Sequence, residues 1–179
     1  MRADCTQCCA IQQEIFSGKL SGVRPLAAQE AIVWRTRCRS NYWEPCVLSG
    51  DDTAHYAFPD NVGFAVNLPH RDSFSPDAAW DTGQDTGLEF CEGAPRFAVE
   101  VRSKNDYGPA AEQEIAAKRA DYFACGTQVV WDVDLLSADV IKSYKASDPE
   151  QAVIFRRGEI ADAEPAVPGW QMAVIDLFE

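Results

Sequence analysis

The sequence lacks several features that would place it directly in a functional class. No apolar run approaches the roughly eighteen residues that a membrane-spanning helix requires, so we expect no membrane span. It also lacks a glycine-rich phosphate loop. The two histidines, His55 and His70, are far from any nucleophile motif, so the sequence predicts no catalytic triad.

Positive charge is scarce and unevenly distributed. Residues 1–50 contain six basic and four acidic residues, and residues 51–179 contain ten basic and 24 acidic ones, so +2 and −14 give the net charge of −12. Most of the net negative charge is explained by its contribution to solubility. Because nucleic-acid affinity depends on neutralising phosphates, DNA binding here would need a bound cation or a local basic patch. The candidates for that patch are Arg71, Arg102, Lys104, Lys118 and Arg119.

The seven cysteines are concentrated near the amino terminus. Five lie in residues 1–50, which together with the change in charge marks an atypical cysteine-rich segment before a main domain at residues 51–179. Cys5 and Cys8 have the spacing of a zinc knuckle, but no second close pair completes a tetrahedral site. With an odd number of cysteines and no charged-then-apolar leader, we expect a reduced cytoplasmic compartment.

Two short segments have the residues that phosphodiester cleavage requires. Ser75-Pro76-Asp77 is followed, 23 residues after the aspartate, by Glu100-Val101-Arg102-Ser103-Lys104. In a strand from residue 96 to 102, Glu100 and Arg102 point to the same face. Metal-dependent hydrolysis needs carboxylates for a hard cation and a nearby positive group. The plainer alternative is a surface ion pair between Glu100 and Arg102.

A helix is predicted from Ala110 to Cys125. Helix formers fill this range, Pro109 precedes it and Gly126 follows it. Helical spacing places Lys118 on an inward, largely apolar stripe. The stripe consists of Ala111, Ile115, Lys118 and Tyr122. The alternative is an exposed pair with Glu114, four residues earlier, in which the lysine stem covers apolar surface.

Further elements are expected after this helix. Strands are predicted at residues 128–134, 140–144 and 152–155, followed by a hairpin turn at 156–159 and a final segment around 170–177. The aromatic residues expected in the core are Trp80, Phe97, Tyr122, Phe123 and Trp131.

In this order and spacing, the segments resemble the Uma2 family of restriction-endonuclease-like proteins, within the PD-(D/E)xK nuclease superfamily. The matching pieces are Ser75–Trp80, Gly93–Ser103, Lys118 with Tyr122 and Gly126, and Val130–Asp134. The resemblance extends from Phe58 to Phe178. It implies an α/β (α+β) fold, a restriction-endonuclease-like mixed β-sheet flanked by helices. It also implies that Asp77 and Glu100 lie on neighbouring strands and hold Mg²⁺ or Mn²⁺.

The chain departs from the superfamily at the position of its usual lysine. Arg102 stands there, two residues after Glu100, and arginine is a poor base although its fork can hold a phosphate oxygen. The resemblance implies that Lys118 on the helix replaces this lysine. Lys104, on the same strand parity as Glu100, is the runner-up; otherwise it contacts the DNA backbone or caps the strand end.

The resulting prediction is a metal-dependent endonuclease acting on DNA. Asp77 and Glu100 are the expected metal ligands, with the Val101 carbonyl as a third oxygen, and Lys118 is the expected catalytic lysine. Arg102 and Lys104 are expected to contact substrate phosphates. Because many related nucleases act as dimers, a homodimer is one expected assembly.

An inactive interaction protein that retains the nuclease fold is the alternative. The acidity favours it, and so do residues 1–50, which lack the helical segment and acidic residue expected in the family. This segment is either a genuine divergence or an artefact of reading the gene, such as a frameshift near codon 50.

Overall fold

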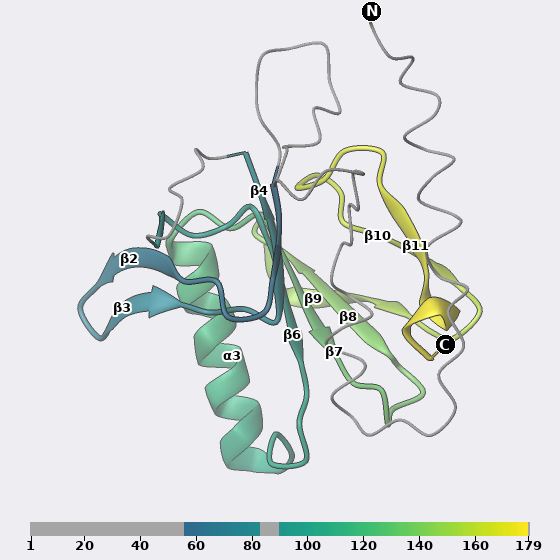
Figure 1. Ribbon diagram of the computed structural model, residues 1–179. Coiled ribbons are helices and arrows are strands. Elements are labelled where there is room, and N and C mark those ends of the chain that lie inside the picture. The colour runs from purple at the N-terminus through teal and green to yellow at the C-terminus, as the bar shows by residue number, and fades with distance from the viewer. Residues whose placement is uncertain (1–55, 83–89, 179) are drawn as a thin grey trace, which may run out of the picture.

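The computed structural model describes residues 56–82 and 90–178 (Figure 1). The predictions for residues 1–50, including the cysteine-rich segment and its C-x-x-C pair, lie outside the described residues, as does His55. Within the described part of the chain, no helix is both long and apolar enough to cross a membrane.

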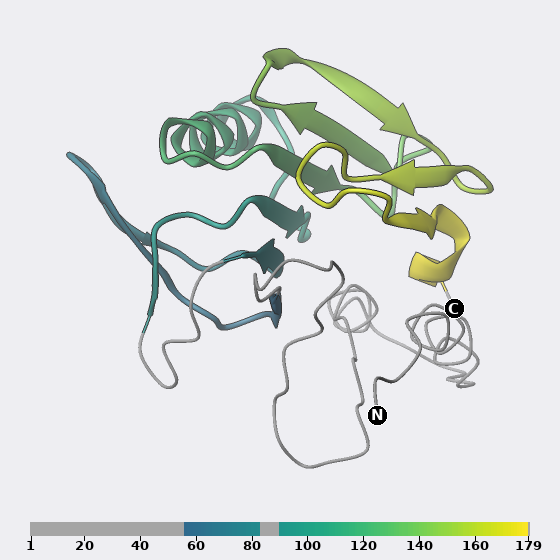
Figure 2. The same ribbon diagram turned by 90° about the horizontal axis from the view of Figure 1, so that it is seen from above.

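A six-stranded mixed sheet forms the centre of the fold (Figures 1 and 2). In spatial order its strands are β1 (Tyr56–Pro59), β4 (Ala78–Asp81), β6 (Phe97–Val101), β7 (Val129–Val133), β8 (Ile141–Lys145) and β9 (Asp148–Phe155). β6 and β7 are parallel, and the other neighbours are antiparallel. The predicted α+β class is confirmed, and β9 begins four residues earlier than expected.

Helix α3 (Pro109–Ala124) connects the two parallel strands, β6 and β7. Parallel neighbours require such a crossover, because a tight turn can join only antiparallel strands. Pro109 occupies the first turn, where its missing N–H costs nothing, and Gly126 ends the helix with φ of 100°. The observed bounds agree with the prediction to one residue at each end.

A two-stranded sheet and a 3-10 helix follow β9. After the predicted turn, where Glu159 N donates to Arg156 O at 3.0 Å, the chain forms β10 (Ile160–Asp162). This strand pairs with β11 (Gln171–Ala173), which leads into η1 (Val174–Phe178). The final segment predicted around residues 170–177 therefore consists of β11 and η1.

A three-stranded sheet precedes helix α3 in the chain and lies beside it. It contains β2 (Phe64–Leu68), β3 (Arg71–Phe74) and the short β5 (Cys91–Glu92). The β2–β3 hairpin projects from the main sheet and runs across the axis of α3 (Figure 1). It is joined to the helix by stacking of Phe74 on Tyr122, with ring centroids 4.0 Å apart.

Alternation along β6 and β7 divides the buried residues into two clusters, one on each face of the sheet. On one face Val99 and Trp131 pack against residues of β10 and η1, such as Ala161 and Leu177. On the other face Ala98 packs with Tyr122 of α3 and with the β2–β3 hairpin. Of the five predicted core aromatics, Phe123 is only partly buried, and the other four are buried.

Candidate active site

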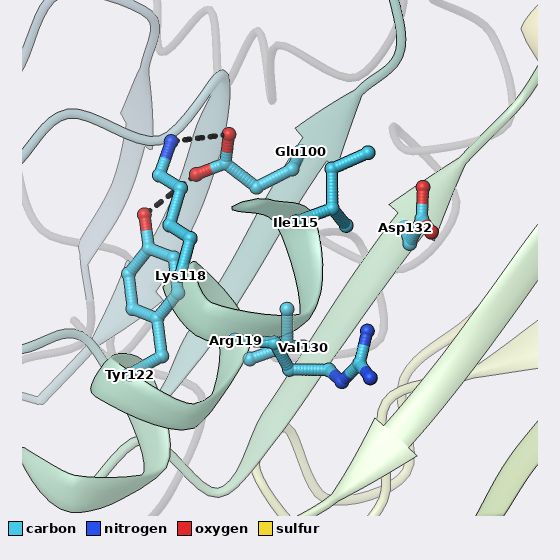
Figure 3. A pocket seen from close by; sticks show the side chains of 7 residues that line it. All are labelled: Glu100, Ile115, Lys118, Arg119, Tyr122, Val130 and Asp132. Carbon is cyan, nitrogen blue, oxygen red and sulfur yellow. Dashed lines mark hydrogen bonds and ion pairs between the residues drawn. The ribbon is translucent and has the colours of Figure 1, made fainter. Parts of the chain in front are cut away.

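Glu100 lies on the face of β6 that is covered by α3. Its Oε2 accepts a hydrogen bond from Lys118 Nζ at 2.6 Å, and its Oε1 accepts one from the Tyr122 hydroxyl at 2.7 Å (Figure 3). Lys118 and Tyr122 are one helical turn apart, so both reach the same carboxylate. The inward stripe predicted for the helix thus brings Lys118 directly to Glu100.

The surroundings of Glu100 disfavour its negative charge. Burial raises the pKa of this carboxyl above its ordinary value and the nearby Asp77 adds to the shift, while Lys118 opposes it. Burial and the proximity of Glu100 also raise the pKa of the Tyr122 hydroxyl, which therefore remains a hydrogen-bond donor. A partly buried carboxylate close to a second negative charge is an environment that favours binding of a cation.

Asp77 is the residue immediately before β4, and it is hydrogen-bonded to β6. Its backbone N donates to Val99 O at 3.0 Å, and its Oδ2 accepts from Val101 N at 2.6 Å. Because Ala78 is paired with Val99, Asp77 lies beside Glu100 on the adjacent strand.

The pair of Asp77 and Glu100 fits a hydrated Mg²⁺, which binds proteins through one or two carboxylates and keeps several waters. Among the described residues there is no group of three or more His, Cys, Asp or Glu side chains that could hold a metal. Any metal held here would therefore depend on two carboxylates and water.

A cleft of about 440 Å³ opens next to Glu100 and Lys118. Its cations come from three elements: Arg71 from β3, Arg102 from the end of β6 and Lys118 from α3. Asp77 is not among the lining residues. A smaller cavity of about 40 Å³ lies between Glu100 and Asp132 under the helix (Figure 3).

Arg102 is enclosed by acceptors of the protein itself. Its Nε and Nη2 each donate to Asp132 at 2.7 Å, and both side chains are 5% exposed. Nη1 and Nη2 also bind the carboxylate of Glu112, and Nη1 donates to Asp106 O at 3.3 Å. These contacts use all five N–H groups of the guanidinium. The expected phosphate contact by Arg102 therefore has no free donor in this arrangement.

Lys104 lies outside the strand from which its position was predicted. β6 ends at Val101, and the chain then turns, with Asp106 N donating to Ser103 O at 3.1 Å. The alternation of β6 therefore does not extend to Lys104, which is exposed and is not among the residues that line the cleft. Of the two candidate lysines, the structure brings Lys118 to Glu100.

Two residues of the site were not predicted as functional. Tyr122 was expected only in the core, and its ring is buried there, but its hydroxyl reaches Glu100. The available signal was its position four residues after Lys118 on the same stripe. Asp132 was not singled out, although a lone acid inside the apolar run Val129–Val133 is itself unusual.

The fold is that of a nuclease-like α+β protein. It resembles a crystal structure from Anabaena variabilis described as "a putative nuclease belonging to DUF820", with a TM-score of 0.52 and 17% identity, over 69% of this chain and 68% of that one. At this identity the likeness concerns the fold alone.

The sequence match identifies the family. The model of the Uma2 family, described as "Putative restriction endonuclease", matches residues 40–175. Because this is more than half of the chain, the protein belongs to the Uma2 family, as the sequence predicted. No curated protein matches the chain. Family and fold together support a nuclease function.

Proposed function

We propose that this protein is an endonuclease that hydrolyses phosphodiester bonds of DNA with the help of Mg²⁺ or Mn²⁺. The observation that carries the proposal is the 2.6 Å contact between Lys118 Nζ and Glu100 Oε2, beside the second carboxylate of Asp77. Membership of the Uma2 family supports the same reaction class.

Asp77 and Glu100 would hold the metal, with the Val101 carbonyl as a further oxygen. The ion, when bound, would neutralise phosphate charge and lower the pKa of a water molecule. Lys118 would orient the attacking water and stabilise negative charge that develops on the phosphate. The water oxygen bonds to phosphorus, one phosphorus–oxygen ester bond breaks, and the departing sugar oxygen takes up a proton.

Tyr122 and Arg102 would act as positioning residues. The Tyr122 hydroxyl fixes one oxygen of Glu100 and leaves the other to Lys118. Arg102 ties the end of β6 to β7 through its ion pair with Asp132 and through its backbone N, which donates to Val133 O at 2.8 Å. This role replaces direct phosphate contact, because the Arg102 donors are already engaged.

A nuclease-fold protein without catalytic activity is the second candidate. It is favoured by the carboxylate of Glu100, which already has a protein partner on each oxygen, and by the lack of a third potential ligand among the described residues. Such a protein would neither cut DNA nor respond to divalent cations.

Nicking of supercoiled plasmid in Mg²⁺ or Mn²⁺ separates the two candidates. Glu100→Gln retains the size of the side chain but removes its charge, so we expect a rate loss of about 100-fold or more. Glu150→Gln is the matched control, because Glu150 is an exposed glutamate on β9, away from the cleft. Equal, metal-dependent nicking by wild type and Glu100→Gln would indicate a contaminating nuclease and remove support for the proposal.

A further inference from the structure

Arg71 is the cation of the cleft whose two terminal guanidinium nitrogens have no hydrogen-bond partner among the described residues. Of the three cations that line the cleft, Arg102 has no free N–H and Lys118 is paired with Glu100. Arg71 donates from Nε to Asp121 Oδ2 at 2.8 Å. Among the described residues, neither of its Nη atoms has a hydrogen-bond acceptor. The two terminal nitrogens are therefore available to a ligand.

The Arg71 side chain is held in place from two sides. Asp121 on α3 binds its Nε, and the guanidinium carbon lies 5.1 Å from the centroid of the Phe74 ring. The other oxygen of Asp121 is bound to His70 Nε2 at 3.0 Å, which fixes the carboxylate in turn. The Arg71 side chain is 31% exposed, so it combines a fixed orientation with access to solvent.

Arg71 lines the same cleft as Glu100 and Lys118. The Phe74 ring, over which its guanidinium lies, stacks on the Tyr122 ring with centroids 4.0 Å apart. Arg71 is thus close to the group that holds Glu100. A guanidinium in such a position matches the paired oxygens of a phosphate, which it can bind with two parallel hydrogen bonds.

We propose that Arg71, oriented by Asp121 and Phe74, is the phosphate-binding residue of this cleft and holds a non-bridging oxygen pair of the DNA backbone. The proposal rests on the proposed nuclease function for the identity of the ligand. It selects Arg71 on β3 from the basic patch that the sequence suggested, in place of the phosphate contact that was expected of Arg102.

The test measures binding of a fluorescein-labelled DNA duplex by fluorescence anisotropy over a range of salt concentrations. All proteins carry Glu100→Gln, so that cleavage does not interfere. Arg71→Gln should weaken binding about tenfold and reduce the slope of log affinity against log salt by about one. Arg71→Lys should preserve the slope and lose part of the affinity, because lysine lacks the planar fork.

Arg157→Gln is the matched control. Arg157 also stacks on an aromatic ring, with its guanidinium carbon 3.5 Å from the Phe178 centroid, but it does not line the cleft. It should change neither affinity nor slope. If Arg71→Gln and Arg157→Gln lost the same amount of DNA affinity, the effect would be one of net charge, and the proposal would be overturned. It would also be overturned if neither variant lost affinity. Thermal unfolding of each variant checks that the β2–β3 hairpin remains folded, and Arg71→Lys retains the charge if Arg71→Gln does not fold.

Failure of this proposal and failure of the nuclease function give different results. If the protein with intact Glu100 nicks plasmid but Arg71 variants bind DNA normally, only the role of Arg71 is wrong. If nicking is absent while binding still depends on Arg71, the phosphate site stands without the enzyme. Absence of DNA binding in every protein would overturn both.

Discussion

The two faces of β6 and β7 are built from alternating residues of the same strands but differ in chemistry. One face presents residues such as Val99 and Trp131, which are 0% and 1% exposed and are covered by the carboxyl-terminal elements. The opposite face presents Glu100 and Asp132, side by side on the two strands. A strand buried on both faces can thus provide a stable core on one side and a polar site on the other.

The helix-covered face also changes character along its length. Ala98 and Val130 are buried under Tyr122, and the next positions on the same face are Glu100 and Asp132. The charged positions lie near the carboxyl ends of these two parallel strands, where the cleft opens. This is the usual location of ligand sites in sheets with parallel strands. Each charge in this region has a partner, which is what burial requires.

The largest effect is expected from removal of the helix lysine on the polar face. Lys118→Met should lower plasmid nicking by about 1,000-fold, because the water-orienting cation is lost while much of the apolar stem is retained. Lys104→Met changes the exposed lysine on the turn after β6 and should leave the rate near wild type. A loss confined to Lys104→Met would move the catalytic role from the helix to that turn.

A large loss of stability is expected when the ion pair of the polar face is broken. Arg102→Ala leaves Asp132 buried without its counter-charge, which should lower the free energy of unfolding by about 3–5 kcal/mol. Urea denaturation measures the change. The double variant Arg102→Ala with Asp132→Ala should recover part of the loss, because no buried charge then remains. Additive losses in the double variant would show that the two side chains act independently.

A somewhat smaller loss is expected on the apolar face. Leu177→Ala, at a position 4% exposed, should cost about 3 kcal/mol through lost burial and the cavity that remains. DNA binding by the folded fraction should not change, because Leu177 contacts the cluster opposite the cleft. Leu136→Ala is the matched control: this leucine is 85% exposed, so its unfolding free energy should stay within about 0.5 kcal/mol.

The smallest effect is expected from the pH dependence of Asp121. Burial would raise the pKa of this carboxyl, but hydrogen bonds from Arg71 and His70 outweigh it and hold the pKa below the ordinary 3.8. The folded state thus favours the ionised form, and this contribution to stability is present above pH 3.8 and is lost as the pH falls through the lowered value.

Acid titration of the unfolding free energy measures this contribution. The difference in unfolding free energy between wild type and Asp121→Asn should become smaller as the solution becomes more acidic. Asp148→Asn, which changes an exposed aspartate on β9, is the control. A gap that stays constant across the acidic range would contradict the assigned cause of the pKa shift.

The sequence predicted those parts of the site that depend on local periodicity. Two-residue alternation placed Glu100 opposite Val99 and Val101, and helical spacing turned Lys118 inward; both positions follow from short-range geometry. The prediction that the strand alternation of Glu100 extends to Lys104 was wrong, because periodicity does not indicate where a strand ends. The turn that begins at Ser103 ended the alternation.

The pairing of Arg102 with Asp132 was not predictable in the same way. It depends on the register of β6 against β7, which aligns Glu100 with Asp132 and is set by tertiary packing. The environment of Arg71 likewise depends on how the β2–β3 hairpin docks against α3, through residues separated by 50 positions in sequence. Neither contact leaves a signal at a fixed short spacing.

The crossover from β6 through α3 to β7 has a consequence for how the site forms during folding. Glu100, Lys118 and Tyr122, with the Arg102–Asp132 pair, all belong to this one continuous stretch of chain. The acid and its lysine are therefore joined by contacts of modest sequence separation, which cost little loop-closure entropy and favour fast folding. Asp77 and Arg71 come from earlier in the chain, at the start of β4 and on β3, so the complete site also requires contacts of longer sequence separation.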